Sequence, residues 1–432
     1  MISLIVVLAI AISIALGYKT NINTGFFAIA FAYIIGCFVL NLKASAIIAM
    51  WPISIFFVIF AVSLFYNFAL VNGTLEKLSQ HLLYGCRKAP KLLPFAVFFA
   101  AVLIAGLGAG FFTVMVFLAP LTLMLCEKTG MSRLVGAIAL NYGALAGANF
   151  MTSASGIVFK SLIENAGFKD SGFVYTTYIF IITMIIPILV ISGFIMFSKS
   201  IKNMGKHIDI EKPKPFNQKQ KINLYLIVLM VIIVLAPPIL HIIMPKTAII
   251  TFINSKMDVG LVSIIFSVIA FMFNLADQKT VIAKVPWSTL IMICGVGMLI
   301  SVAIKAGTIK LLASWIGGNM PVLLVPIALC VVGGIMSFFS STLGVVTPAL
   351  FPIVPSIAAA TGLNPAILFI CIVIGAQATS ISPFSSGGSL VLGSCVNEEE
   401  RTKLFPKLLF CAVPMCLAVS TVVSIIISLI IR

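Results

Sequence analysis

The chain has 432 residues, of which 61% are apolar and 9% are charged, and its formal net charge is +16. A soluble domain contains roughly 45–50% apolar residues, so this composition excludes a water-soluble globular protein. The positive charge would indicate nucleic-acid binding in a soluble protein. Here the lysines lie between apolar segments, where they act as topology signals, so we expect no nucleic-acid partner.

The chain begins with an apolar segment, Met1 to Leu16, which lacks the basic region of a signal peptide and is predicted to span the membrane. Further stretches carry no charge and are about long enough, at roughly 20 residues, to cross the hydrocarbon as a helix. They are Thr20 to Leu42, Ala44 to Leu75, Ser171 to Ser198, Ile222 to Leu240, Val285 to Ile304 and Leu408 to Ile431. The nine cysteines are scattered, without a CxxC pair, and predict no transition-metal site.

The lysine-rich segment 199–221 is the longest hydrophilic stretch and divides the chain nearly in half. Cytoplasmic loops are enriched in Lys and Arg, so we expect this linker in the cytoplasm of a multi-pass protein of the cell (inner) membrane, surrounded by lipid. Spans are counted outward from the linker, and 92–126 and 321–360 are treated as hairpins that enter and leave on one side. The count gives five spans in each half, with both termini outside.

Two halves of five spans have opposite orientations, which is the inverted-repeat plan of secondary transporters. We therefore predict an all-α polytopic fold with a first repeat at 1–198, a linker at 199–221 and a second repeat at 222–432. A weak internal repeat supports this division, because Asn72-Gly-Thr in the first half corresponds to Ala306-Gly-Thr in the second. At a constant offset of 232 residues, Thr129, Gly143, Ser153 and Gly156 fall on Thr361, Gly375, Ser385 and Gly388.

Clusters of Gly, Ser, Thr and Pro interrupt the apolar sequence in both halves. They are Gly106 to Thr113, Gly147 to Gly156, Ser337 to Gly344 and Thr379 to Ser389. An unpaired backbone group in hydrocarbon costs several kcal/mol, so a helix break at membrane depth persists only where it faces protein, water or a ligand. The earlier cluster of each half is predicted to form the tip of a re-entrant hairpin, at 92–126 and 321–360. The later cluster is predicted to break a spanning helix, at 134–164 and 366–395.

Broken helices expose N-termini that favour anions and C-termini whose carbonyls ligate cations, and Ser and Thr hydroxyls serve either purpose. The alternative is that these small residues merely let helices pack closely. No carboxylate or histidine is placed at mid-membrane by the sequence, which argues against a protein-borne proton relay. Neutral oxygen ligands suit a hard cation such as sodium. The chain shows no catalytic motif, so an enzyme is not expected.

At these clusters the chain resembles the ion-transporter superfamily, whose divalent-anion/sodium symporters carry Ser-Asn-Thr at two hairpin tips and Thr-Pro-Pro-like loops in two broken helices. The second half matches this pattern better, with Ser340-Ser341-Thr342 at the tip and Ser382-Pro383-Phe384-Ser385 at the break. The first half departs from it. Its tip reads Gly108-Ala109-Gly110 and its break reads Asn149-Phe-Met-Thr-Ser153.

Within the superfamily, the amino-terminal half resembles the malonate and dicarboxylate carrier group. The resemblance rests on Asn23-Thr-Gly-Phe-Phe-Ala-Ile-Ala-Phe-Ala, Val71-Asn-Gly-Thr-Leu-Glu-Lys-Leu and the stretch from Gly147 to Gly156. It implies a homodimer in which a scaffold supports a moving transport domain, with substrate and cations between hairpin tips and broken helices. The implied cation ligands are Gly108, Ala109, Gly110 and Asn149 in one site and Ser340, Ser341, Thr342 and Thr379 in another. The implied substrate-binding residues are Thr113, Thr152, Ser153, Thr342, Ser382, Pro383 and Ser385.

The sequence thus predicts a secondary transporter of a small carboxylate, such as malonate or a four-carbon dicarboxylate, coupled to sodium by symport and without another cofactor. One alternative is an inorganic-ion or sodium/proton antiporter of the same superfamily. A channel or an intramembrane enzyme is a remote alternative.

Overall fold

The computed structural model describes residues 2–20, 22–85, 92–197, 213–244, 246–308, 311, 319–338, 340–395 and 398–430. Within these ranges the chain forms helices joined by turns, and no strand occurs among them. Seven of the described helices are long and apolar enough to cross a membrane, or eight if one bent pair is counted as a span. Shorter apolar helices accompany them in both halves, and the count of ten spans stays a prediction.

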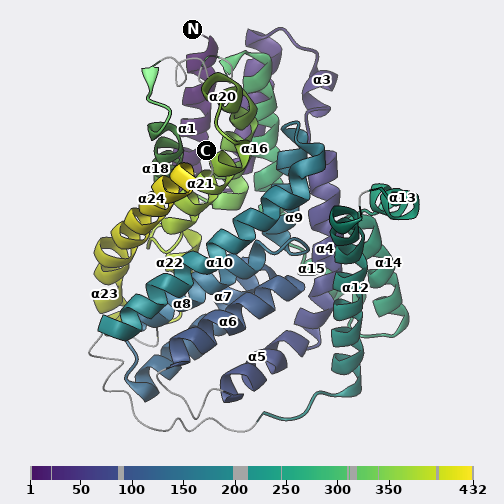
Figure 1. The fold of residues 1–432 in the computed structure, drawn as a ribbon, viewed down its shortest axis with the longest axis vertical. Helices are drawn as coiled ribbons and strands as arrows, with labels where there is room; N and C mark the ends of the chain where they lie inside the picture. The colour runs from purple at the N-terminus through teal and green to yellow at the C-terminus, as the bar shows by residue number, and fades with distance from the viewer. Residues whose placement is uncertain are drawn as a thin grey trace.

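The helices follow one another in a similar order in the two halves (Figure 1). The first half contains α1 (Ile2–Thr20), α2 (Thr24–Tyr33), η1 (Ile34–Val39), α3 (Ala44–Ile48), α4 (Ile53–Val71), α5 (Thr74–Gly85), α6 (Leu93–Ile104), η3 (Ala105–Ala109), α7 (Gly110–Thr129), α8 (Arg133–Ala148), α9 (Ala154–Asn165), η4 (Lys169–Ser171) and α10 (Gly172–Phe197). The second half contains α12 (Gln218–Ile243), α13 (Ala248–Lys256), α14 (Val259–Met272), α15 (Gln278–Ala283), α16 (Trp287–Lys305), α18 (Leu324–Phe338), η5 (Thr342–Val346), α19 (Thr347–Leu350), η6 (Phe351–Ile353), α20 (Val354–Thr361), α21 (Pro365–Ala378), α22 (Ser386–Gly393), α23 (Glu398–Lys407), η7 (Leu408–Ala412) and α24 (Val413–Ile430).

Most of the predicted linker, namely residues 199–212, lies outside the described residues. Its last residues are helical, because α12 already begins at Gln218. A capping box explains this start: the Asn217 side chain accepts the backbone N–H of Gln220, whose side chain accepts the backbone N–H of Asn217.

Both predicted helix breaks are present. In the segment 134–164 the helix stops after α8 and restarts at α9, and in 366–395 it stops after α21 and restarts at α22. The hairpin candidates also contain a turn between two helical arms. In the first, Gly108 and Gly110 have φ values of 99° and 70°, a conformation that favours glycine and explains the glycine-rich tip. Whether each pair of arms enters and leaves on one membrane side stays a prediction.

The internal repeat extends to the packing of the broken helices. A Cβ added to Gly156 would lie 2.1 Å from the carbonyl oxygen of Phe150, and one added to Gly388 would lie 2.2 Å from that of Ser382. Both glycines therefore allow the restarted helix to press against the carbonyls of its own break. Gly388 and Ser382 each follow their first-half counterpart by 232 positions, the offset predicted from the sequence.

The same offset relates the contact between each broken helix and its hairpin. Gly143 of α8 lies against the carbonyl of Phe98 in α6, with 2.5 Å between an added Cβ and that oxygen. Gly375 of α21 lies against the carbonyl of Cys330 in α18, at 1.9 Å by the same measure. Close backbone packing through small residues is usual between membrane helices. The two halves therefore repeat a structural unit as well as a sequence pattern.

Helices α4 and α16 also correspond, at an offset of 234 residues. Pro52 and Pro286 occupy their N-caps with similar backbone angles. Beyond their C-terminal ends, Gly73 and Gly307 have φ values of 75° and 74°. The Asn-Gly-Thr and Ala-Gly-Thr sequences thus end equivalent helices.

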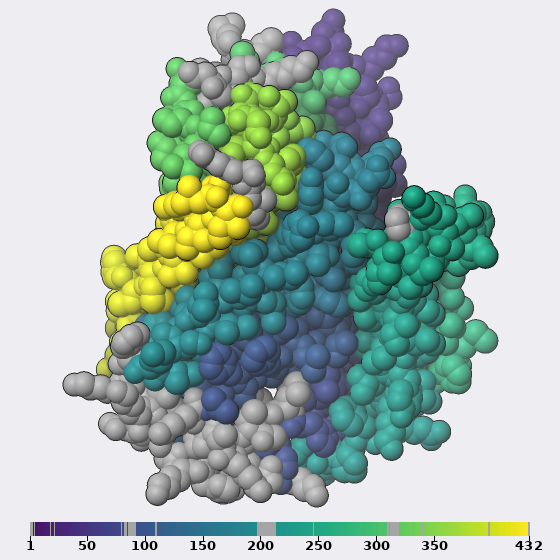
Figure 2. Space-filling view, viewed as in Figure 1, coloured from purple at the N-terminus to yellow at the C-terminus, as the bar shows by residue number. Residues whose placement is uncertain are grey.

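Helices α10 and α24 run obliquely across the face of the molecule shown in Figure 2. The exposed large side chains of α10 include Ile181, Ile185 and Leu189, and those of α24 include Val422 and Ile426. Exposed large apolar side chains of this kind suit lipid rather than water. Together with the long apolar helices, they identify the chain as a membrane protein that spans the bilayer several times.

Candidate functional site

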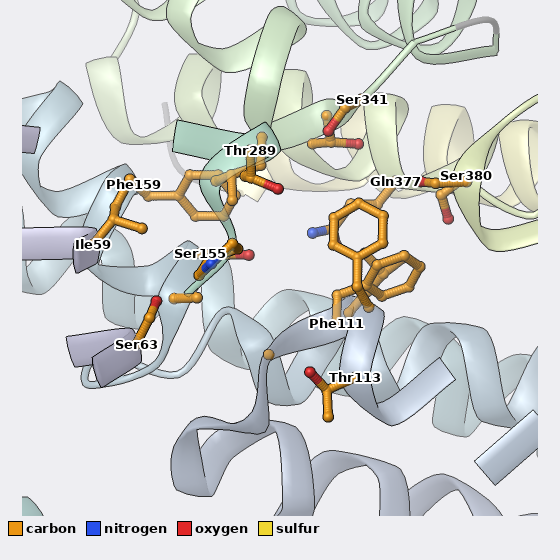
Figure 3. Close-up of a pocket in the computed structure, with 18 of the residues that line it drawn as sticks. Ile59, Ser63, Phe111, Thr113, Ser155, Phe159, Thr289, Ser341, Gln377 and Ser380 are labelled. Carbon is orange, nitrogen blue, oxygen red and sulfur yellow. The ribbon is translucent and has the colours of Figure 1, made fainter. Parts of the chain in front are cut away.

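A cavity of about 110 Å³ lies where the two halves meet (Figure 3). Its lining comes from α4, both hairpin turns, the starts of α9 and α22, the end of α21 and the region between α15 and α16. Sites for drug-sized ligands measure about 300–1,000 Å³, so this cavity fits a small solute.

Several sequence-predicted residues line the cavity together. They are Gly108, Gly110 and Thr113 from the first half and Ser340, Ser341, Thr342 and Ser385 from the second. Residues more than 200 positions apart in the sequence therefore share one chamber, as the prediction of a single site between hairpin tips and broken helices requires.

Helix N-termini converge on this cavity. Helix α7 begins at Gly110, α9 at Ala154, α22 at Ser386, and the helical run that follows the second hairpin turn begins at Thr342. Each of these first residues lines the cavity. A helix N-terminus carries a partial positive charge and backbone N–H groups without an intrahelical partner. The chamber is therefore favourable for an anion.

At the start of α22 the Ser385 side chain caps no backbone N–H, and the N–H of Gly388 donates to the carbonyl of Ser380 at 3.3 Å. The Ser385 hydroxyl donates to the carbonyls of Ser380 and, at 3.0 Å, Ser382, and it accepts no backbone N–H of its own helix. The second hairpin turn differs, because the Ser341 hydroxyl accepts the N–H of Gly344 at 3.1 Å. Beside it, Thr342 shares a 3.0 Å hydrogen bond with Ser337.

Other predicted site residues do not line the cavity. Asn149, Thr152, Ser153, Thr379, Ser382 and Pro383 are buried around the breaks, and the side chain of Ala109 lies outside the described residues. Two of them instead attach a break to its neighbouring hairpin arm. Ser153 donates to the carbonyl of Ala105 at 2.6 Å, and Thr379 donates to the carbonyl of Gly334 at 2.8 Å. These two hydroxyls therefore hold the helix breaks in place against the hairpin arms.

Asn149 takes part in a buried amide pair that joins the two halves. Its side chain donates to Gln377 at 3.1 Å and accepts from Gln377 at 3.0 Å. It also donates to Thr183 at 3.0 Å. Gln377 lines the cavity, so Asn149 contributes to the chamber by fixing this neighbour.

The sequence analysis missed several polar residues of the cavity, of which only Ser155 and Ser380 lie within the break clusters. They include Ser63, Asn67, Ser155, Lys284, Thr289, Gln377 and Ser380. A signal was available for two of them: Asn67 and Gln377 are isolated amides within long apolar segments, where a polar side chain needs a partner or a function. Lys284 carries no such signal, because the turn that brings α15 to the cavity is not visible in the sequence.

A second cavity, of about 510 Å³, lies at the other end of the α4 and α16 pair. The first cavity uses Ile59, Ser63 and Asn67 of α4, and the second uses Ile293, Gly297 and Ser301 of α16, which are their counterparts at an offset of 234. The two cavities are therefore related by the internal repeat. Its further lining includes Leu162 and Asn165 of α9 together with Pro348 and Pro352.

The comparisons with known proteins agree with these features. Residues 1–148 match the family model described as dicarboxylate carrier protein MatC N-terminus. The structure is similar to the crystal structure of the Alcanivorax borkumensis YdaH transporter, with a TM-score of 0.62 and 14% sequence identity over 89% of each chain. No curated protein matches the sequence.

These findings confirm the resemblance inferred from the motifs and the predicted fold class. The family match is to a carrier and the fold is that of a solved transporter, so neither is that of an enzyme. At 14% identity the structural similarity establishes the fold and leaves the substrate to be argued from the cavity.

Proposed function

We propose that this protein is a secondary active transporter of a small carboxylate, most specifically a dicarboxylate such as malonate or a four-carbon acid. The observation that carries the proposal is the composition of the small cavity. Helix N-termini and hydroxyl groups surround it, Lys284 contributes a positive charge, and no Asp or Glu is among the described residues that line it. Such a chamber stabilises a carboxylate through backbone N–H and hydroxyl donors. The amino-terminal match to a dicarboxylate carrier model supports this substrate class.

We propose transport by alternating access, which the two cavities support. They lie at opposite ends of the α4 and α16 pair, which serves as the scaffold in this proposal. Movement of the hairpins and broken helices along this scaffold would carry the bound substrate from the side of the first cavity to the side of the second, as in other inverted-repeat transporters. The first cavity lies at the end nearer the linker: Gln220 donates to the carbonyl of Asn72, just after α4, at 3.1 Å.

Sodium symport is part of the proposal. The second hairpin turn provides hydroxyl and carbonyl oxygens at Ser340, Ser341 and Thr342, which are ligands that suit sodium. The competing antiporter function would need a titratable group within the membrane. No Asp or Glu is among the described residues that line the cavity, and its titratable residue, Lys284, is exposed, which favours symport over proton exchange.

The proposed arrangement in the cell has the linker in the cytoplasm and both termini outside the inner membrane. We also propose a homodimer, in which the α4 and α16 scaffolds of two subunits remain fixed while the transport elements move. The basic residues of the linker support its placement on the cytoplasmic side.

Uptake of labelled malonate and succinate into proteoliposomes tests the function. An imposed sodium gradient should drive accumulation, and replacement of sodium by choline should abolish it. Uptake driven by a pH gradient and indifferent to sodium would replace sodium symport by proton-coupled transport. If neither acid enters under any gradient, the carboxylate proposal fails.

Serine substitutions test the chamber. Ser341→Ala and Ser385→Ala each remove a hydroxyl at a helix start in the cavity and should raise the KM for the transported acid. Ser389→Ala is the matched control, since this exposed hydroxyl donates to the carbonyl of Ser386 at 3.1 Å and does not line the cavity. Unchanged KM in both cavity variants would refute the assigned site.

A further inference from the structure

Lys284 is the one charged residue among the described residues that line the small cavity. It is exposed and follows α15 directly, two positions before the N-cap of α16. Among the described carboxylates, none forms an ion pair with its ammonium group. Its charge is therefore available to a soluble anion that enters the cavity.

The surrounding contacts fix the segment that carries this lysine. Asn67 of α4 donates to the carbonyl of Val281 in α15 at 3.1 Å. At the other end of α15, Asp277 accepts the N–H of Thr280 at 2.9 Å and its hydroxyl at 2.7 Å. These hydrogen bonds lower the pKa of the Asp277 carboxyl below its usual value, so the cap is ionised at neutral pH. A capped and anchored α15 holds Lys284 at the cavity.

The second cavity has no equivalent charge. At the offset of 234 that relates α4 to α16, Lys284, Pro286 and Thr289 of the first cavity correspond to Met50, Pro52 and Ile55 of the second. Neither Lys nor Arg is among the described residues that line the second cavity. The internal repeat thus places equivalent positions of α4 and α16 in the two cavities and changes the charge of one.

We propose that Lys284 captures the anionic substrate at the linker-side entrance and gives the transporter a lower KM on that side than on the other. The inference rests on the proposed function, because it requires an anionic substrate. A single cation in a narrow entrance raises the local concentration of anions, and salt screens this effect over about 10 Å at 0.1 M. Lys284 is a capture residue, while the helix starts hold the bound carboxylate.

Transport measured from each side tests this role. Lys284→Met, which copies Met50, should raise the KM for malonate or succinate about five-fold from the linker side, the size of one unit-charge attraction in an exposed site. From the other side the KM should change less than two-fold. Right-side-out and everted membrane vesicles present the two sides separately.

Matched variants separate charge from structure. Lys284→Arg should keep the wild-type KM, and Lys279→Met should have no effect, because Lys279 is an exposed lysine of α15 outside the cavity lining. The effect of Lys284→Met should shrink at high ionic strength. An equal KM change on both sides, no change on either, or the same change in Lys279→Met would overturn the proposal.

A fluorescence measurement distinguishes failure of this inference from failure of the carboxylate proposal. Trp287 lies three positions after Lys284 and is 41% exposed. With Trp51 and Trp315 replaced by Phe, quenching of Trp287 by iodide reports local anion concentration, and quenching by acrylamide reports access alone. Lys284→Met should roughly halve the iodide quenching constant and leave that of acrylamide unchanged.

In one outcome, Lys284→Met lowers iodide quenching while the wild-type protein transports neither malonate nor succinate. That outcome would contradict the proposed substrate class and still support anion capture by Lys284. Iodide quenching unaffected by Lys284→Met would overturn the capture role, whichever acids the wild-type protein transports.

Discussion

The amide pair between Asn149 and Gln377 provides a test of how the two halves are joined behind the cavity. Both side chains are nearly inaccessible to solvent, at 0% and 5% exposure. Replacing Asn149 by Leu leaves the Gln377 amide without its hydrogen bonds, whereas Thr183 keeps its own bond to the carbonyl of Ile179 at 2.8 Å. The cost of the substitution should therefore fall mainly on Gln377.

The expected magnitude follows from the number of bonds. Leaving a buried polar group unpaired costs about 1–3 kcal/mol, so Asn149→Leu and Gln377→Met should each lower the free energy of unfolding by about 2 kcal/mol. Interhelical hydrogen bonds in membrane proteins contribute about 0.6 kcal/mol each on average. With two bonds in the pair, the double variant should show a coupling energy of about 1 kcal/mol.

Reversible unfolding in mixed detergent micelles, followed by circular dichroism, measures these energies. The matched control is Asn223→Leu, because the Asn223 amide is buried and has no hydrogen-bond partner in the described part of the chain. This substitution should be neutral or stabilising. Additive effects of Asn149→Leu and Gln377→Met, within about 0.3 kcal/mol, would refute the view that the pair joins the halves.

Two further predictions concern packing and charge. Gly156→Ala and Gly388→Ala should each lower the free energy of unfolding by about 1–3 kcal/mol in the same assay, because the added Cβ meets a carbonyl oxygen. Gly393→Ala is the control and should have no such effect, because the space around Gly393 is open. Equal effects at all three positions would contradict the repeat packing. Arg133 forms an ion pair with Glu400 across the two halves. Glu400→Arg should therefore destabilise the protein, and adding Arg133→Glu to this variant should restore the lost stability. Absence of rescue would show that the pair contributes nothing to stability.

Much of the architecture could be predicted because it follows from simple properties of the chain. Apolar length predicts helices that cross a membrane, and clusters of Gly, Ser and Thr predict where such helices stop. The breaks after Ala148 and Ala378 occur within the predicted segments. The offset of 232 between Gly156 and Gly388 was visible in the sequence and relates equivalent contacts in the structure.

The composition of the cavity was only partly predictable. Residues at the hairpin turns and helix starts carry a local signal, and several of them line the chamber. Lys284, Ser63 and Thr289 carry none, because their place depends on how α4, α15 and α16 pack against the turns. Such tertiary contacts are set by side-chain packing over long sequence separations, which a single sequence does not encode in a readable pattern.

The two hairpin turns occupy equivalent places in the two halves but differ in backbone conformation and in chemistry, and the chemical difference bears on ion coupling. In the first, the backbone of Gly108 packs on the ring of Tyr66, where an added Cβ would lie 1.9 Å from the ring, so a side chain is excluded. In the second, Ser341 and Thr342 present hydroxyls beside the backbone. A sodium ligand set needs several oxygens, and the second turn offers both hydroxyl and carbonyl oxygens. We therefore expect the tighter cation site in the second half, with the first turn contributing mainly to the shape of the substrate chamber.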